Sequence, residues 1–286
     1  MMNAAREMTH EEILMLHMLG VLPRHILDIV EPPSLDKALK PGKLYKTLRL
    51  ILPQYGFTPG YPETLLARAT QTLSRQREAG IETLSCIDAR YPKTLLNIRD
   101  FPLLIHYLGD PALFSEPCQA AVIGARKADR EGCEVAWKLG YEFGKERVVV
   151  SGLAAGCDTA AHRGCMEAGG RTVAVVATGL DLVFPRENAA LQEEILRNGG
   201  AVLSEQPFGA EATPRRLVAR NRLQAALSDT VIVAQCPERS GTLHTVEFAR
   251  RYGKKILAWR FAARNEANAG NFNLIGSGVA SPIVLK

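Results

Sequence analysis

Hydrophobic residues in the first eighty positions recur at spacings of three and four, which is the period of an amphipathic helix. Clusters of Pro and Gly interrupt this pattern several times, and such clusters divide a helical region into short pieces. The pattern therefore predicts a small bundle of short helices. The predicted helices cover residues 11–19, 24–30, 43–52 and 62–79.

Beyond about residue 116 the pattern changes to short β-rich apolar runs that alternate with amphipathic helices. Six strands are expected, at residues 120–123, 147–150, 172–177, 201–203, 230–234 and 255–259. One helix is expected in each gap, near residues 131–143, 159–168, 189–197, 216–227 and 243–252. Strict alternation, with strands apolar enough to be buried on both faces, is typical of an α/β fold with a doubly wound, mostly parallel sheet.

The composition is that of an ordinary globular protein. Of the 286 residues 47% are hydrophobic and 23% are charged, which excludes a disordered, collagen-like or coiled-coil chain. The longest apolar stretch, residues 13–22, is shorter than the ~18 residues that a membrane span needs, so no membrane insertion is expected. Six cysteines stand singly, without the spacing of a zinc site or a disulfide framework. This predicts no metal site and a reducing, cytoplasmic location.

Positive charge is concentrated in one part of the chain. The net charge is +5, and residues 211–260 hold ten Lys or Arg against four Asp or Glu. Residues 1–210 carry a small negative excess instead. A concentrated basic region indicates a polyanion as ligand, although solvated basic helix faces would give the same count.

The carboxyl ends of parallel strands meet at one edge of a sheet, where the following helix N-termini present free N–H groups. The loops at this edge of the predicted sheet are rich in Gly, Ser and Thr, and one carries Arg126. Gly lets the backbone approach a phosphate closely, and Arg can bind phosphate oxygens as a fork. We therefore expect a phosphate-binding edge, although turns of this kind are rich in Gly and Ser in any α/β protein. The candidate residues are Gly124, Arg126, Ser151, Gly152, Gly156, Thr178, Gly179, Ser240, Gly241 and Thr242.

Known nucleotide motifs are missing at this edge. Neither GxxxxGK[ST] nor, after the first predicted strand, GxGxxG is present, so the sequence supports neither a P-loop nor a standard dinucleotide site. No cofactor is therefore expected.

Several longer motifs occur in a specific order. They are AVIGAR (121–126), SGLAAGCDTAAH (151–162), TGLDLVFPREN (178–188), SEQP (204–207), ARNR (219–222) and SGTLHT (240–245). In order and spacing this set resembles the DNA-processing protein A family, also called DprA or Smf. The likeness extends over residues 79–280, because residues 79–102 and 270–278 also resemble the family's first and last segments.

The resemblance implies a small helical N-terminal domain at residues 1–78 and a Rossmann-like domain at residues 79–286, without the C-terminal winged helix that some members carry. It implies a homodimer that binds single-stranded DNA in a basic pocket, protects incoming DNA and loads a RecA-type recombinase during natural transformation. It implies no catalysis. By motif, Arg126, Ser151 and Gly152 would line the pocket. The ARNR motif would supply the further contacts Arg220, Asn221 and Arg222.

Other polar residues allow two interpretations each. Asp158 and His162 lie four apart and would form an acid and base pair on one helix face, but Asp158 also suits a helix N-cap and His162 a structural role. Glu205 is either a general base or a partner of a helix N-terminus. Asp181 and Glu187 are expected to fix the shape of their loop. Aromatic residues that could stack on bases are scarce, and the nearest is Phe184.

Two other classes of function remain open. One is a nucleotide-binding enzyme that hydrolyses a nucleoside monophosphate, of the related lysine-decarboxylase-like, cytokinin-activating group. That group has a PGGxGTxxE motif, whereas residues 237–242 read PERSGT, without the paired glycines. The other is a module that senses a free nucleotide and reports it through the N-terminal helices.

Overall fold

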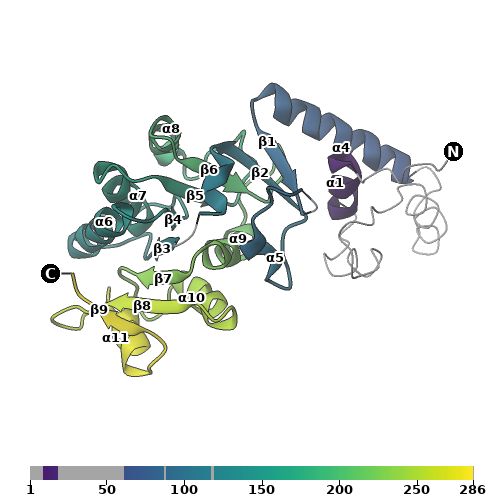
Figure 1. The fold of residues 1–286 in the computed structure, drawn as a ribbon. Coiled ribbons are helices and arrows are strands. Elements are labelled where there is room, and N and C mark those ends of the chain that lie inside the picture. Colours follow the sequence, from purple (N-terminus) through teal and green to yellow (C-terminus); the bar gives the residue numbers. More distant parts are fainter. Residues whose placement is uncertain (1–8, 19–60, 87, 117–118, 286) are drawn as a thin grey trace.

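Two helices at the N-terminal side lie beside a single large sheet. The computed structural model describes residues 9–18, 61–86, 88–116 and 119–285, and the helices predicted at 24–30 and 43–52 lie outside these ranges. Helices α1 (His10–Met18) and α4 (Tyr61–Glu78) pack against each other next to strand β1 (Glu82–Ser85) (Figure 1). In the part of the chain that the structure describes, no helix is long and apolar enough to span a bilayer.

Within the described residues the sheet has nine strands, in the order β1-β2-β6-β5-β4-β3-β7-β8-β9. Strands β3 to β8 pair in parallel and confirm the six predicted strands. Three strands were not predicted: β1 and β2 add an antiparallel edge next to β6, and β9 extends the other edge. The bounds are β2 (Leu104–Gly109), β3 (Ala120–Ile123), β4 (Val149–Ser151), β5 (Thr172–Val176), β6 (Ala201–Ser204), β7 (Thr230–Val233), β8 (Lys255–Trp259) and β9 (Ser281–Ile283).

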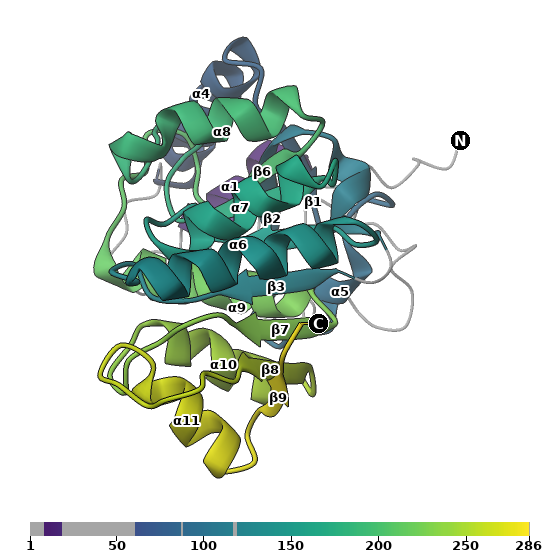
Figure 2. The same ribbon diagram turned by 90° about the vertical axis from the view of Figure 1, so that its left-hand side faces the viewer.

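Helices cover both faces of this sheet, as the alternating pattern predicts. Figure 2 shows α6, α7 and α8 side by side in front of one face, and α9 and α10 lie on the other face (Figure 1). Shorter elements complete the connections. The helices are α5 (Lys93–Leu96), α6 (Arg130–Gly144), α7 (Cys157–Glu167), α8 (Ala189–Arg197), α9 (Pro214–Leu227), α10 (Thr242–Arg251) and α11 (Ala269–Gly276), with short 3₁₀ turns η2 (Pro111–Phe114) and η3 (Arg186–Asn188).

The central strands are buried on both faces, which explains their continuous apolar runs. Along β3, Ala120 and Val122 pack with side chains of α6 and α7, whereas Ala121 and Ile123 pack with side chains of α9 and α10. The alternation follows from the two-residue period of a strand. It lets the helices of both layers pack against the same central strands.

The strand order places a crevice at the centre of the sheet. From β3 the chain proceeds through β4, β5 and β6 in one direction and then returns to β7, on the other side of β3. The loops that leave β3 and β7 lead to helices on opposite faces, so they diverge at the carboxyl ends of these strands. Ligands of open α/β sheets bind at this type of switch point.

One glutamine joins the N-terminal helices to the sheet. Gln76 of α4 is buried, and its Nε2 lies 2.9 Å from His106 Nδ1 and 3.2 Å from Thr83 Oγ1. Its Oε1 accepts a hydrogen bond from the Phe208 amide at 2.9 Å, and the Arg75 guanidinium lies 4.6 Å from the centre of the Phe208 ring. The loop between β6 and α9 is therefore held by helix α4.

Candidate nucleic-acid interface

An open cleft of about 460 Å³ lies at the carboxyl ends of β3 and β7. The loop after β3, the loop after β4, helix α9 and the start of α10 form its walls. Elements distant in sequence therefore contribute to one site at the switch point. The lining residues are Ile123, Gly124, Ala125, Arg126, Lys127, Ala154, Asp158, Pro214, Leu217, Val218, Arg220, Asn221, Gln224, Pro237, Arg239, Ser240, Gly241, Thr242 and Thr245.

The charge of this cleft is positive. Among the described residues that line it, four are Lys or Arg, and the only acidic one is Asp158. Arg126, Lys127 and Arg239 are exposed, so their charged groups are available to a ligand. Asp158 is 7% exposed, and its charge is enclosed by the protein. A polyanion is the type of ligand that this arrangement favours.

Arg220 forms the floor of the cleft. Its Nη1 donates hydrogen bonds to the Gly152 carbonyl oxygen at 2.6 Å and to the Val175 carbonyl oxygen. Burial lowers the pKa of Arg220 to about 10, although the nearby Asp158 carboxylate acts in the opposite direction. The group therefore remains charged at neutral pH. It supplies a fixed positive charge at the base of the cleft.

Asp158 is not the helix N-cap that the sequence predicted. The N-cap of α7 is Gly156, and Asp158 lies in the first turn of this helix. Its Oδ2 accepts hydrogen bonds from the amides of Gly152 at 3.1 Å and Ala154 at 3.4 Å. Burial is the largest effect on the carboxyl group and raises the pKa of Asp158. Asp158 thus fixes the loop after β4 rather than the start of the helix.

His162 has the structural role that was expected as an alternative to catalysis. It is fully buried, and its Nδ1 lies 2.8 Å from Thr172 Oγ1. Burial lowers the pKa of His162 to about 3, so the imidazole is neutral at physiological pH. His162 does not line the cleft, and the structure therefore gives no support to an acid and base pair with Asp158.

Two of the predicted glycines bring the loop after β3 against the start of α7. Gly156 has φ of +76°, which favours glycine, and a Cβ atom there would lie 2.4 Å from the Ala125 carbonyl oxygen. A Cβ atom at Gly124 would lie 2.4 Å from Cys157 Sγ. These glycines allow the two loops to touch. That contact places the backbone of Arg126 next to the N-terminus of α7.

The predicted residues at the start of α10 also lie in the cleft. Ser240 Oγ accepts a hydrogen bond from the Thr242 amide at 3.2 Å and donates one to Thr242 Oγ1 at 3.0 Å. Asn221 Nδ2 donates to the Gly241 carbonyl oxygen at 3.5 Å and so links α9 to this loop. The N-terminus of α10 therefore faces the cleft, where the positive end of the helix dipole favours an anion.

Three predicted residues lie behind the cleft, not in it. Ser151 is fully buried, and its Oγ donates to the Val122 carbonyl oxygen at 2.7 Å between β4 and β3. Thr178 Oγ1 donates to the Leu182 carbonyl oxygen at 3.1 Å, and Gly179 is buried. Because their polar groups bind the protein itself, these residues shape the sheet edge without facing the cleft.

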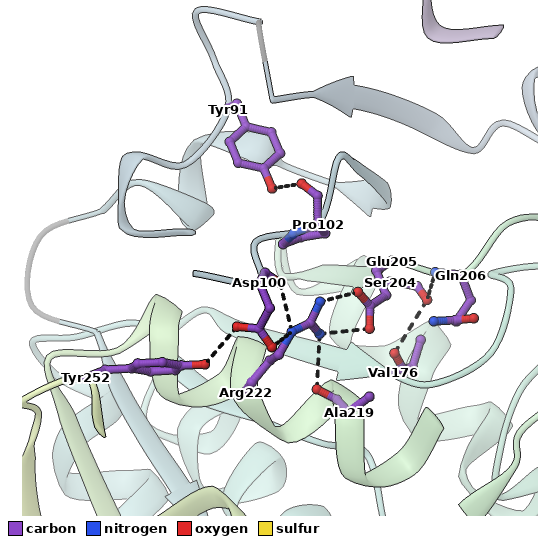
Figure 3. A network of polar contacts seen from close by, with 10 residues as sticks. All are labelled: Tyr91, Asp100, Pro102, Val176, Ser204, Glu205, Gln206, Ala219, Arg222 and Tyr252. Carbon is purple, nitrogen blue, oxygen red and sulfur yellow. Dashed lines mark hydrogen bonds and ion pairs between the residues drawn. The ribbon is translucent and has the colours of Figure 1, made fainter. Parts of the chain in front are cut away.

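Arg222 also lies away from the cleft. Residues two apart on a helix point in nearly opposite directions, so Arg220 and Arg222 face different sides of α9. Arg222 forms an ion pair with Glu205 at 2.6 Å (Figure 3). Arg222 thus does not line this cleft, and Glu205 is paired with it rather than being a free base or a partner of a helix N-terminus.

A smaller hollow of about 100 Å³ adjoins the cleft and shares Arg126, Ala154, Leu217 and Arg220 with it. Phe184 and Pro185 line this hollow, and 42% of Phe184 is exposed. Phe184 is therefore available for stacking, which the sequence left open. In the same loop, Asp181 Oδ1 accepts a hydrogen bond from the Gly209 amide at 2.8 Å, so Asp181 shapes the loop as expected.

Sequence reasoning missed several lining residues. Lys127 and Arg239 stand next to motif residues, and their position in loops at the strand ends was a usable signal. Leu217, Val218 and Gln224 form part of the α9 wall and carry no signal that separates them from ordinary core positions.

A doubly wound sheet with a basic cleft at its switch point defines the class of Rossmann-type proteins that bind nucleotides or polynucleotides. The family model of DNA recombination-mediator protein A matches residues 82–285. The chain belongs to this family, which confirms the resemblance found in the motifs. The family is one of recombination mediators.

Curated relatives and solved structures agree with this assignment. The DNA processing protein DprA of Streptococcus pneumoniae is 38% identical over 196 residues, which are 68% of this chain and 69% of that protein. The Smf protein of Synechocystis is 33% identical over 212 residues. These residues are 73% of this chain but 53% of that protein, so the chain spans about half its length.

Two solved structures share the fold. The X-ray structure of DprA from S. pneumoniae matches with a TM-score of 0.79 and 30% identity, over 97% of this chain and 95% of that chain. A structure of DprA from Helicobacter pylori, described as showing its single-stranded DNA binding mode, matches with a TM-score of 0.65 and 30% identity, over 72% of this chain and 91% of that chain.

Proposed function

We propose that this chain binds single-stranded DNA in the cleft between β3 and β7 and acts as a recombination mediator. The observation that supports this most directly is the convergence of Arg126, Lys127 and Arg239 with the N-terminus of α10 on one cleft. Guanidinium groups and helix N-termini both bind phosphate oxygens. The buried charge of Arg220 adds to the attraction beneath them.

The walls of the cleft favour a single strand over a duplex. Pro214, Leu217 and Val218 give the α9 wall an apolar surface, and Phe184 is exposed in the adjoining hollow. In a duplex the bases are stacked inside, whereas a single strand can place them against apolar and aromatic side chains. Phosphates then lie against the cations and bases against α9 and Phe184.

The cleft favours binding over hydrolysis of a nucleotide. Hydrolysis would need a carboxylate that can activate water, but Asp158 accepts hydrogen bonds from two amides and is buried. Glu205 lies outside the cleft in an ion pair with Arg222. Release of ribose phosphate from AMP by the purified protein would instead support the enzyme alternative.

Family membership supports further parts of the proposal. We propose that the chain acts in the cytoplasm as a homodimer, protects incoming DNA and loads a RecA-type recombinase onto it. We also propose that residues 1–78 form a helical domain and residues 79–286 the Rossmann-like domain. Crosslinking with a purified RecA-type protein on oligonucleotides and sedimentation of the free chain would test the two assemblies.

The test of DNA binding uses fluorescence anisotropy with labelled oligo-dT at several salt concentrations. Arg126→Ala removes an exposed charge from the cleft, so we expect about tenfold weaker binding. We also expect a salt slope that is shallower by about 0.7. Arg250→Ala is the matched control, because Arg250 is exposed at the far end of α10 and pairs with Glu247. If Arg126→Ala and Arg250→Ala bind equally well, the cleft is not the binding site.

A further inference from the structure

The side of α9 that faces away from the cleft carries a buried polar network centred on Arg222 (Figure 3). Arg222 Nη1 donates to Glu205 Oε1 at 2.8 Å, and Nη2 donates to Glu205 Oε2 at 2.6 Å. Nε lies 3.1 Å from both the Asp100 carbonyl oxygen and Asp100 Oδ2. Both side chains of the Arg222–Glu205 pair are 9% exposed. This is a bidentate ion pair in the interior, with a second carboxylate at its edge.

The guanidinium group of Arg222 has little capacity left for a ligand. An arginine has five N–H donors, and Nη1 also donates to the Ala219 carbonyl oxygen at 3.1 Å. Four of the five donors therefore have protein acceptors in Glu205, Asp100 and Ala219. Any effect of Arg222 on a ligand in the cleft must pass through the protein.

The network joins α9, which forms one wall of the cleft, to two segments outside the cleft. Glu205 follows β6, Asp100 lies in the segment before β2, and Arg222 belongs to α9. The Tyr252 hydroxyl donates to Asp100 Oδ1 at 3.4 Å, and Tyr252 caps the C-terminus of α10. Helices α9 and α10 are thus both linked to Asp100, while other parts of the two helices line the cleft.

The location of Arg222 on α9 determines what the network can control. Arg220 and Asn221 face the cleft from the same turn of the helix. A shift or rotation of α9 that broke the Arg222–Glu205 pair would move both of these residues with it. A bidentate pair fixes orientation as well as distance, so it holds the helix in one rotational setting.

We propose that Arg222 is a positioning residue for nucleic-acid binding, which acts by anchoring α9 to Glu205 and Asp100 so that Arg220 and Asn221 stay in the cleft. The proposal rests on the proposed function of the cleft. It assigns to Arg222 an effect on affinity without contact with DNA, and it assigns the same effect to Glu205.

Glu205→Gln provides the decisive test, measured by oligo-dT anisotropy across a salt series. Removing a negative charge near a polyanion site should tighten binding if only charge matters. The positioning role predicts the opposite, about tenfold weaker binding with an unchanged salt slope, because the bidentate anchor is lost. Binding by Glu205→Gln as tight as that of the wild type, or tighter, overturns the proposal.

Arg222→Met and the double variant Arg222→Met with Glu205→Met complete the experiment. The single variant leaves an unpaired buried carboxylate, which is strongly destabilising, whereas apolar replacement of both partners is often tolerated. We expect the double variant to bind oligo-dT more tightly than Arg222→Met, and both to keep the wild-type salt slope. A slope that becomes shallower by about 0.7 in the double variant, as expected for Arg126→Ala, would make Arg222 a phosphate contact and refute the proposal.

Failure of the proposed function gives a different result. If the wild type does not bind oligo-dT, or if Arg126→Ala binds normally, the cleft assignment fails and the positioning role fails with it. If Arg126→Ala behaves as expected and Glu205→Gln binds normally, only the positioning role fails. Circular dichroism melts of each variant establish that the proteins compared are folded at the assay temperature.

Discussion

Arg220 and Asp158 are two buried, oppositely charged groups beside the same glycine, and the dependence of one charge on the other can be tested directly. Arg220 is 4% exposed and Asp158 is 7% exposed. A Cβ atom built on Gly152 would lie 2.2 Å from Arg220 Nη1 and 2.6 Å from Asp158 Oδ2, so both groups lie against the Cα atom of this glycine. Arg220→Met removes one charge and leaves the other buried. A buried group that is left without its partner costs about 1–3 kcal/mol, a substantial fraction of the ~5–15 kcal/mol stability typical of a domain.

The double variant with Asp158→Asn separates this cost from simple loss of packing. The Asn side-chain oxygen can still accept hydrogen bonds from the Gly152 and Ala154 amides, and it carries no charge. We therefore expect the free energy of unfolding, measured in urea, to be lower in Arg220→Met than in the double variant. Burial already raises the pKa of Asp158, and loss of Arg220 raises it further.

The pH dependence of Arg220→Met has a definite sign. A carboxyl group whose pKa is higher in the folded state than in the unfolded state favours folding when it is protonated, and this contribution is lost as the pH rises. The destabilisation of Arg220→Met relative to the wild type should therefore be larger at pH 8 than at pH 5. The dependence of one charge on the other would be refuted if Arg220→Met lowered the free energy of unfolding by less than about 1 kcal/mol. It would also be refuted if adding Asp158→Asn did not restore part of that free energy.

Two further predictions concern stability and the shape of the cleft. His162 has a pKa of about 3 in the fold, against ~6.5 in an unfolded chain, so acid favours unfolding below pH 6.5. Between pH 7 and pH 5, the free energy of unfolding measured in urea should fall by about 2 kcal/mol more in the wild type than in His162→Gln. Equal decreases would contradict a lowered pKa of His162. Gly156→Ala should reduce both stability and oligo-dT binding, because its Cβ atom would lie 2.4 Å from the Ala125 carbonyl oxygen. Gly169 is the matched control, because it has the same φ of +76° but open space around a Cβ atom. Gly169→Ala should therefore lower the free energy of unfolding by only about 1 kcal/mol, through backbone strain, and leave DNA binding unchanged. Equal effects of the two substitutions would refute the close contact at Gly156.

The central strands could be predicted because each is a short, nearly continuous run of apolar residues. Apolar residues on both faces of β3 to β8 give continuous runs that only a buried parallel sheet explains well. The edge strands lack such runs. Strand β9 is largely exposed, with the sequence SPI, and β1 has two residues that are not fully buried. Pairing with a neighbour defines these strands, and a single sequence does not contain that information.

The loops of the site were predictable for a related reason. Once β3 and β7 are taken as parallel neighbours at a switch point, the residues that follow them must lie together. Gly124, Arg126 and residues 240–242 therefore reach the cleft as expected. Ser151 did not, because the last residue of a strand can still point into the sheet, and its hydroxyl binds β3 instead. Whether such a side chain points into the sheet or towards the cleft depends on the residue at which the strand ends, and the sequence does not define that residue to within one position.

The ARNR motif shows why adjacency in sequence differs from adjacency in space. A helix rotates by about 100° per residue, so three consecutive residues cover more than half of its circumference. Arg220 and Asn221 face the cleft, whereas Arg222 reaches Glu205 on the opposite side. The two charged residues of this motif hold the helix from two directions: Arg220 binds backbone carbonyls beneath the cleft, and Arg222 binds an acidic group behind it. Such anchoring favours binding of a flexible polyanion. Because the helix is already held in place before the ligand binds, ordering it adds no further entropic cost to the free energy of binding.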